Sequence, residues 1–246
     1  MINAQLIVRA TNAEYTGENI EFTGLTTDSR AVQAGELFVA FSGENFDGHN
    51  YCAKAVELGA TGVLVSKDVT GLPENVAVFK VPNTLKAFQE IAREYRRSFE
   101  NLKVFAITGS NGKTVVKEWL YQLLKEDYHI TRSPKSYNSQ IGVPLSVWQL
   151  SEETELAIFE AGISEQGEMQ RLQAIIKPTI GVITYIGPEH GENFPSLQAK
   201  RAEKMQLFAN CPVVIEDPTH QNVRTCAAVM RALGYNEDTI AQRILQ

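Results

Sequence analysis

Val104-Phe-Ala-Ile-Thr-Gly-Ser-Asn-Gly-Lys-Thr114, followed by Val-Val-Lys-Glu-Trp-Leu-Tyr-Gln-Leu-Leu124, is the stretch that decides the fold. Apolar residues at positions 104, 105 and 107 predict a buried strand, and apolar residues recur with helical spacing after Thr114. Between them lies the loop T-G-x-x-G-K-T, which is shorter than the usual Walker A pattern because position 107 is Ile. This order is typical of a phosphate-binding loop. The alternative is an ordinary strand-turn-helix junction.

The loop carries the groups that a bound phosphate needs. Gly109 and Gly112 permit a tight turn that points backbone N–H groups at an anion. Lys113 supplies a positive charge, and the hydroxyl of Thr114 can bind Mg²⁺. The residues expected to hold nucleotide phosphates are Gly109, Ser110, Asn111, Gly112, Lys113 and Thr114.

Composition narrows the class of protein and its partners. The chain has 246 residues, 43% of them hydrophobic, and a net charge of −6. No Lys/Arg cluster is interleaved with aromatic residues, which argues against nucleic acid or an acidic membrane surface as a partner. The first residues lack the pattern of a signal peptide and no run is long enough to span a bilayer, so the expected location is the cytoplasm. The odd number of widely spaced cysteines, 3 in all, predicts reduced thiols.

The pattern of apolar runs predicts two α/β units with a boundary near residue 100. In residues 1–100, short strands are expected at 36–41, 62–66 and 76–81, with helices at 51–58 and 85–99. In residues 101–246, strands are expected at 104–108, 156–160, 179–186 and 212–215. These are mostly continuous apolar runs, as in parallel sheets, so the second unit is predicted to be a three-layer, doubly wound nucleotide-binding domain. Closing helices are expected at 222–233 and 237–245, with Gly234 after the first and Asn236 capping the second.

Three polar residues are expected near the phosphate loop, because ligands of such sheets lie beyond the carboxyl ends of the strands. Glu160 ends the run Leu-Ala-Ile-Phe, where it could meet a metal bound to a phosphate. His190 follows the strand expected at 179–186, and Asn138 lies in a polar turn before an apolar helix. The simpler alternatives are that Glu160 is a solvated residue at a strand end, His190 is a surface histidine and Asn138 belongs to an ordinary helix start.

Several segments together resemble the central domain of the Mur ligases. They are residues 108–118, 133–145, 159–164 and 187–194. The first unit agrees, because Thr27-Asp-Ser-Arg30, residues 35–41 and residues 45–50 resemble the family's uridine-nucleotide-binding domain. The resemblance is strongest to members that join D-alanyl-D-alanine to UDP-N-acetylmuramoyl-tripeptide, especially to the ligase half of ligase/alanine-racemase fusions. It covers about residues 20 to 215.

The resemblance implies an ATP-dependent ligase of peptidoglycan synthesis, with ATP and Mg²⁺ as cofactors and those two small molecules as substrates. ATP would phosphorylate a terminal carboxylate, and the dipeptide amine would attack the acyl phosphate. The implied phosphate and adenine contacts are Lys113 and Asn222, and the implied substrate contacts are Ser29, Arg30 and Asn138. The implied metal ligands are Thr114, Glu160, His190 and Lys204, the last as a carbamate. The simpler reading of Lys204 is an exposed helix lysine.

The chain also departs from the family pattern. Tyr185 stands where the family has Asn, which puts the loop of His190 in doubt. Only residues 216–221 separate the strand expected at 212–215 from the helix of Asn222, where the family has several strands, and the family's C-terminal ligase domain is not found. An internally shortened, poorly active piece is therefore expected. The alternatives are a non-catalytic nucleotide-binding module and a folylpolyglutamate synthase-like ligase, although the latter should lack the motifs of the first unit.

Overall fold

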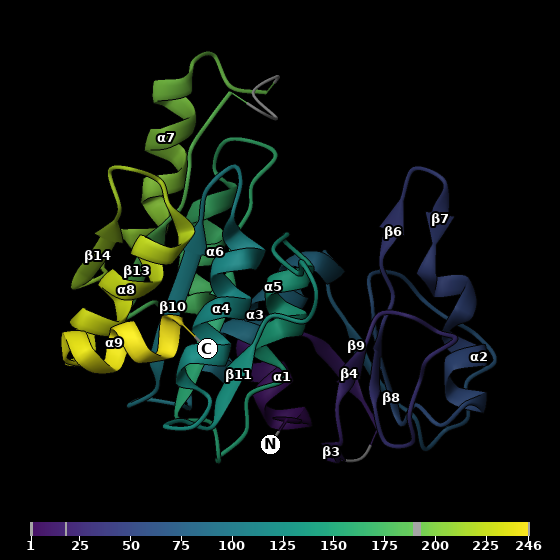
Figure 1. Ribbon diagram of the computed structural model, residues 1–246. Helices are drawn as coiled ribbons and strands as arrows, with labels where there is room; N and C mark the ends of the chain where they lie inside the picture. The colour runs from purple at the N-terminus through teal and green to yellow at the C-terminus, as the bar shows by residue number, and fades with distance from the viewer. Residues whose placement is uncertain (1, 18, 189–192, 246) are drawn as a thin grey trace. The chain divides into compact units, whose positions relative to one another are not determined.

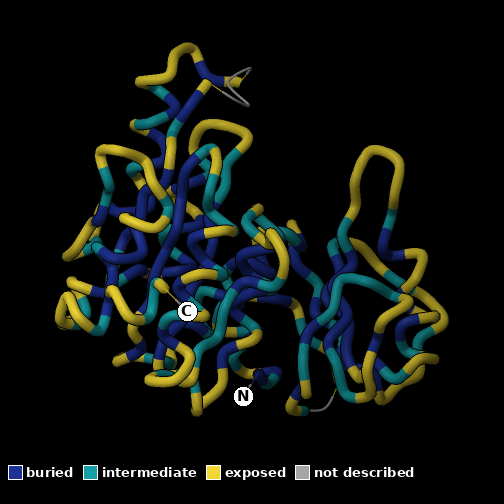
Figure 2. Tube along the Cα trace, viewed as in Figure 1, coloured by how far each residue is buried: buried dark blue, intermediate teal, exposed yellow. Residues whose placement is uncertain are grey.

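A computed structural model describes residues 2–17, 19–188 and 193–245 of the chain, which divides into two compact units, Met1–Ser98 and Phe99–Gln246 (Figure 1). Both units are α/β, and in each the central strands are buried (Figure 2). Within the described ranges, no helix is long and apolar enough to cross a membrane.

The first unit is built on a five-stranded sheet in the order β2-β9-β8-β5-β4. Four of these strands are parallel, and β2 runs antiparallel to β9. The strands are β2 Glu14–Thr16, β4 Leu25–Thr26, β5 Leu37–Val39, β8 Gly62–Val65 and β9 Ala77–Lys80. There are also two short antiparallel strand pairs. One consists of β1 Ile2–Asn3 and β3 Glu21–Phe22, and the other of β6 Ser42–Gly43 and β7 Phe46–Asp47. The helices are α1 Ala4–Thr11, α2 Cys52–Glu57, α3 Thr84–Arg97 and the 3-10 turn η1 Gly48–Tyr51.

The helices of the first unit form where the sequence provides caps and apolar stripes. The side chain of Asn83 accepts a hydrogen bond from the Lys86 amide at the start of α3, and α3 packs on α1. α2 contributes Cys52 and Ala55 to a core that contains Phe38 and Val63 of the sheet. Burial of one side of each short helix against the sheet explains why these segments fold despite modest length.

The second unit contains a five-stranded, fully parallel sheet in the order β11-β12-β10-β13-β14. The strands are β10 Lys103–Thr108, β11 Ile130–Arg132, β12 Leu156–Glu160, β13 Ile180–Ile183 and β14 Val213–Glu216. The helices are α4 Lys113–Leu124, α5 Gly142–Val147, α6 Glu168–Ile176, α7 Leu197–Met205, α8 Asn222–Ala232, α9 Glu237–Ile244 and the 3-10 turn η2 Gln206–Phe208.

Helices cover both faces of this sheet. On one face, Phe105 and Val182 share a core with Leu120 of α4 and Met230 of α8. Neighbouring residues of a strand point to opposite faces, and a Cβ at Gly181 would lie 2.5 Å from the ring of Phe208 on the other face. The predicted three-layer, doubly wound architecture is confirmed.

The elements lie close to their predicted bounds, with one instructive difference. β13 ends at Ile183, although the apolar run predicted a strand up to residue 186. Beyond Ile183 the backbone turns to contact the phosphate loop, because the Ser110 amide donates to the Tyr185 carbonyl at 2.7 Å. Gly234 has a φ of +92°, and the side chain of Asn236 caps α9, as the sequence predicts. Cys52, Cys211 and Cys226 are free thiols, also as predicted.

Candidate functional site

Both glycines of the phosphate loop are required by its geometry. Gly109 and Gly112 have φ values of +154° and +87°. A Cβ at Gly109 would lie 1.9 Å from Oγ1 of Thr184, and one at Gly112 would lie 2.7 Å from Oδ1 of Asn222. The loop is therefore pressed against the ends of β13 and α8.

Two amides of the loop, those of Ser110 and Asn111, have partners within the protein. The amides of Ser110 and Asn111 both donate to the Tyr185 carbonyl, at 2.7 and 3.3 Å, and the Gly187 amide donates to the Ser110 hydroxyl at 3.1 Å. The amides suited to a phosphate are those of the first turn of α4, which have no partner within the helix. The role expected of Ser110 and Asn111 is thus to fix the loop.

Three lysine ammonium groups lie around the loop. Lys113 Nζ donates to the Gly109 carbonyl at 2.8 Å, and Lys204 Nζ donates to the same oxygen at 3.2 Å. Lys200 Nζ donates to the Gly187 carbonyl at 2.7 Å. Burial lowers the pKa of Lys113, and burial together with the Lys113 and Lys200 ammonium groups lowers the pKa of Lys204 to about 8. Reading Lys204 as an exposed helix lysine is wrong, because Lys204 and Lys200 are both only 3% exposed.

Glu160 lies beside the loop, as its place at the end of β12 predicts. Its side chain is fully buried, and Oε2 accepts a hydrogen bond from the Thr114 hydroxyl at 3.0 Å. Oε1 lies 3.1 Å from Lys117 Nζ without hydrogen-bond geometry, and it has no hydrogen-bond partner. A buried carboxylate oxygen with open lone pairs, next to a threonine hydroxyl, fits the oxygen ligands that Mg²⁺ prefers.

Lys117 is a residue of this site that the sequence reading missed. It is fully buried and donates to the carbonyls of Ser133, at 2.8 Å, and Lys135, and it forms a second ion pair with Glu118. A signal was present in the sequence, since Lys117 lies on the same helical stripe as Leu120 and Leu124, which face the core.

Of the two asparagines of interest, Asn222 lies at the loop and Asn138 lies near Glu160. The Asn138 carbonyl accepts a hydrogen bond from the Gly162 amide at 2.7 Å, just after Glu160. Asn222 begins α8 with its side chain against Gly112. His190 lies outside the described residues, so Glu160, Thr114, Lys204, Asn138 and Asn222 are the candidates brought together here.

Tyr185, the departure from the family pattern, lies at the centre of the site. Its backbone carbonyl accepts the two loop amides, while its ring is 38% exposed and meets His220 edge to face at 5.4 Å. His220 belongs to the short connection before α8. Tyr185 and the short connection before α8, the two places where the sequence departs from the family pattern, therefore contact one another.

The candidate substrate residues of the first unit lie beyond the carboxyl end of β4. The guanidinium of Arg30 binds both carboxylate oxygens of Asp28, at 2.9 and 2.8 Å, and its side chain is 87% exposed. This pairing lowers the pKa of Asp28 to about 2. Ser29 lies between them and is half-buried.

A Ser-His-Asp arrangement in the same unit does not form a nucleophile. His49 Nδ1 lies 2.6 Å from Asp47 and Nε2 lies 3.2 Å from the Ser66 hydroxyl. The Ser66 backbone amide donates to Nε2 at 2.9 Å, so that nitrogen already serves as an acceptor and cannot take the hydroxyl proton. The cluster instead ties the β6/β7 hairpin to the end of β8.

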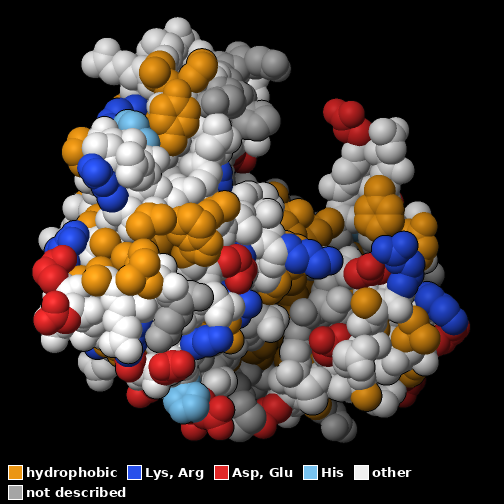
Figure 3. Space-filling view, viewed as in Figure 1, with side chains coloured by type: hydrophobic (Ala, Val, Ile, Leu, Met, Phe, Trp, Pro, Cys, Tyr) orange, Lys and Arg blue, Asp and Glu red, His pale blue; other side chains and the backbone are white. Residues whose placement is uncertain are grey.

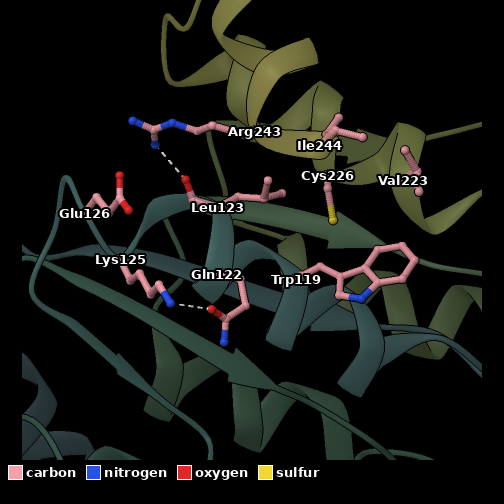
Figure 4. A pocket seen from close by; sticks show the side chains of 9 residues that line it. All are labelled: Trp119, Gln122, Leu123, Lys125, Glu126, Val223, Cys226, Arg243 and Ile244. Atoms are coloured by element: carbon pink, nitrogen blue, oxygen red, sulfur yellow. Dashed lines mark hydrogen bonds between the residues drawn. The ribbon is translucent and has the colours of Figure 1, made fainter. Parts of the chain in front are cut away.

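A cavity of about 470 Å³ lies on the outer side of α4, away from Thr114 and Glu160. Hydrophobic side chains gather where α4 and α8 meet (Figure 3), and the exposed ones on these helices include Val115, Trp119 and Val223. In Figure 4, Arg243 donates to the Leu123 carbonyl at one end of the cavity, and Trp119 lies at the other. Of the predicted site residues that the structure describes, none lines this cavity.

Comparison with known families identifies the chain's relatives. The Mur ligase middle domain matches residues 107–242, more than half of the chain. The chain belongs to the Mur ligase family. The family's catalytic domain matches residues 21–96, so both units of this Mur ligase chain have counterparts in the family. The resemblance inferred from the motifs is confirmed.

Individual relatives point to one branch of the family. The chain is 32% identical over 250 residues to the UDP-N-acetylmuramoyl-tripeptide--D-alanyl-D-alanine ligase of Bacillus subtilis, covering 99% of this chain and 54% of that protein. The MurF ligase of Thermotoga maritima, solved in complex with ADP, matches with a TM-score of 0.70 and 28% identity, over 80% of this chain and 46% of that chain. A MurF structure from Acinetobacter baumannii matches with a TM-score of 0.87 over 99% of this chain and 67% of that chain, although at 23% identity this speaks for the fold alone. The chain spans about half the length of the curated relatives that it matches.

Proposed function

We propose that this chain carries the substrate-binding and ATP-binding parts of a ligase that joins D-alanyl-D-alanine to UDP-N-acetylmuramoyl-tripeptide through an acyl phosphate. The observation that carries the proposal is the buried Glu160 carboxylate beside Thr114 on a glycine loop, in a chain 32% identical to a ligase of that name. The proposed parts are residues 1–100 for the UDP-muramoyl-peptide and residues 101–246 for ATP, in peptidoglycan synthesis in the cytoplasm.

The residues of the loop would act mainly by holding charge in place. Lys113 and the first-turn amides of α4 bind the β- and γ-phosphates, and Asn222 contacts adenine. Thr114 and Glu160 hold Mg²⁺, which supplies positive charge to the phosphoryl oxygens when it is bound. Asn138 is proposed to contact the transferred phosphoryl group.

Lys204 and His190 are the proposed ligands of a second Mg²⁺. For Lys204 this requires a carbamate, in which the neutral amine adds CO₂ and loses one proton. Burial and neighbouring cations lower the pKa of Lys204 to about 8, which raises the fraction of neutral amine available for that addition.

In the first unit, Ser29 and Arg30 are proposed to contact the uridine diphosphate. Arg30 already binds a carboxylate in bidentate geometry, and the same planar donor set suits a phosphate. Because the ion pair is exposed, the Arg30 guanidinium can leave Asp28 and bind a phosphate with little loss of free energy.

We further propose that these 246 residues alone do not complete the reaction. The connection between β14 and α8 spans only residues 217–221. Correct positioning of a dipeptide amine against an acyl phosphate contributes about 7–11 kcal/mol to catalysis. The expected activity is at most slow ATP hydrolysis that does not depend on the dipeptide.

Calorimetry and product analysis test this function. UDP-N-acetylmuramoyl-tripeptide and ADP·Mg²⁺ are titrated separately, and phosphate release is then followed with ATP, with and without D-alanyl-D-alanine. Binding of both ligands without ligated product is the expected result. Absence of both binding events would support a non-catalytic module instead, and ligated product by mass spectrometry would contradict the proposed incompleteness.

A further inference from the structure

Lys117 is a buried charge that the proposed reaction does not use. It lies on α4 one turn after Thr114 and is 0% exposed. A lysine is almost never enclosed in this way without a partner that justifies the loss of hydration. The partner nearest the proposed metal site is Glu160, whose Oε1 lies 3.1 Å from Lys117 Nζ.

The surroundings of Lys117 fix its ammonium group in place. Its hydrogen bonds go to the carbonyls of Ser133 and Lys135, in the segment after β11. The Ser133 hydroxyl in turn accepts a hydrogen bond from the Glu160 amide at 3.1 Å. The ammonium group therefore cannot move away from Glu160 without breaking the contacts that hold this segment to the end of β12.

The same contacts balance the charge of the Glu160 carboxylate but leave one of its oxygens without a hydrogen bond. Because the hydrogen bonds of Lys117 go to the two carbonyls, Oε1 of Glu160 lies beside a positive charge and still keeps its lone pairs open. Among the residues with described positions, no group of three or more His, Cys, Asp or Glu side chains is placed to hold a metal ion. Lys117 also pairs with Glu118, but Glu118 has a second cationic partner in Arg132. A divalent cation arriving alone would therefore meet one carboxylate, Glu160, whose charge Lys117 already balances.

From this geometry we propose that Lys117 prevents the site from binding a divalent cation on its own, so that the cation enters only together with the nucleotide phosphates. The inference deepens the proposed function and rests on it for the identity of the nucleotide. Nucleotide phosphates supply the negative charge that Lys117 removes from Glu160, and Mg²⁺ commonly combines one or two carboxylates with phosphate oxygens. Lys117 is thus a positioning residue that sets the order in which ligands bind.

Mn²⁺ serves as the probe, because its binding is read directly by electron paramagnetic resonance without any turnover. The full chain, Lys117→Gln and Lys117→Met are titrated with Mn²⁺ alone and with Mn²⁺ in the presence of ADP. Glutamine keeps hydrogen-bond donors for the Ser133 and Lys135 carbonyls while removing the charge. Lys125→Met, at the exposed end of the same helix, is the matched control.

The proposal predicts that the parent chain and Lys125→Met bind Mn²⁺ weakly alone and much more tightly with ADP. Removal of the ammonium charge should strengthen binding of Mn²⁺ alone by about tenfold or more. In the double variant Lys117→Gln/Glu160→Gln, this gain in Mn²⁺ affinity should disappear. If Lys117 had only a structural role, neither the gain nor its dependence on Glu160 would be seen.

Two results would overturn the proposal. One is a parent chain that binds ADP and yet binds Mn²⁺ as tightly without ADP as with it, which can be measured even if neither variant folds. The other is a folded Lys117→Gln or Lys117→Met that binds Mn²⁺ alone no better than the parent. Failure of the proposed function is distinguishable, since the parent would then bind no ADP with or without Mn²⁺, whereas the metal-only titrations would still report on Lys117.

Discussion

Glu160 and Asp28 are both carboxylates that face a cation, but in opposite surroundings. The Glu160 and Lys117 side chains are each 0% exposed, whereas Asp28 and Arg30 are 43% and 87% exposed. A buried pair has lost its hydration, so each member depends on the other. An exposed pair is solvated and screened, so either member can exchange its partner for a ligand. The ion pair of the second unit is therefore fixed in place, whereas the ion pair of the first unit can open to accept a ligand.

The largest expected effect is on stability, at the buried pair. Lys117→Met leaves Glu160 buried without its cation and should lower the free energy of unfolding by about 3–5 kcal/mol. Urea unfolding followed by tryptophan fluorescence suits this test, because both tryptophans, Trp119 and Trp148, lie in the second unit. Lys125→Met should stay within about 0.5 kcal/mol of the parent. A loss below about 1 kcal/mol for Lys117→Met would contradict the contrast.

Lys113 sharpens the contrast within the second unit, because its charge is proposed to bind a ligand rather than to stabilise the fold. Lys113→Ala should weaken ADP·Mg²⁺ binding by at least about 1.5–3 kcal/mol, as expected for a lost charge-assisted contact, and in practice bring it below detection. Stability should change little, since burial already lowers the pKa of Lys113 and its ammonium group gains no carboxylate hydrogen bond. Calorimetry and urea unfolding on the same preparation separate the two effects. If Lys113→Ala binds ADP as tightly as the parent, the assignment of residues 109–114 as a phosphate-binding loop is wrong.

The sequence predicted the architecture because apolar runs and glycine spacing are local signals. The apolar runs at 104–108 and 156–160 and the loop at 109–114 predicted β10, β12 and the start of α4 as parts of a parallel α/β sheet. The position of Glu160 followed from the rule that strand ends meet at one edge. These features depend on chain neighbours alone, so a single sequence suffices for them.

The remaining features depend on contacts between distant segments. Nothing near residue 110 predicts that its amide donates to the carbonyl of Tyr185, which lies 75 residues away in the chain. Lys117 was overlooked because a lysine on a helix is usually solvated, and only its spacing from apolar neighbours hinted at burial. The lowered pKa of Lys204 likewise depends on burial and on the Lys113 and Lys200 ammonium groups, which come from distant segments of the chain.

Arg30 tests the exchangeable half of the comparison. Arg30→Ala should weaken binding of UDP-N-acetylmuramoyl-tripeptide by about 1.5–3 kcal/mol, because a charge-assisted contact to phosphate is lost. The free energy of unfolding should change little, since the pair with Asp28 is exposed and screened by solvent. Lys54→Ala, which removes another exposed ion pair of the same unit, should leave both quantities unchanged. Unchanged affinity in Arg30→Ala would place the substrate contact elsewhere.

The smallest expected effect is the response of Asp28 to acid. The side-chain hydrogen bond from Arg30, followed by the backbone hydrogen bond from the Arg30 amide, lowers the pKa of Asp28 from 3.8 to about 2. Because the folded-state pKa lies below the unfolded value, the stabilising contribution is fully present above pH 3.8 and is lost as the pH falls through about 2. In Arg30→Ala the pKa should return most of the way to 3.8, with the backbone amide retaining part of the shift. Carboxyl NMR titration of Asp28 in the parent and the variant measures this, and high salt should raise the pKa in the parent far more than in the variant, since an exposed pair is screened. Titration of Asp28 near 3.8 in the parent would show that Arg30 is not held by Asp28, and the contrast with the buried pair would then lose its exposed member.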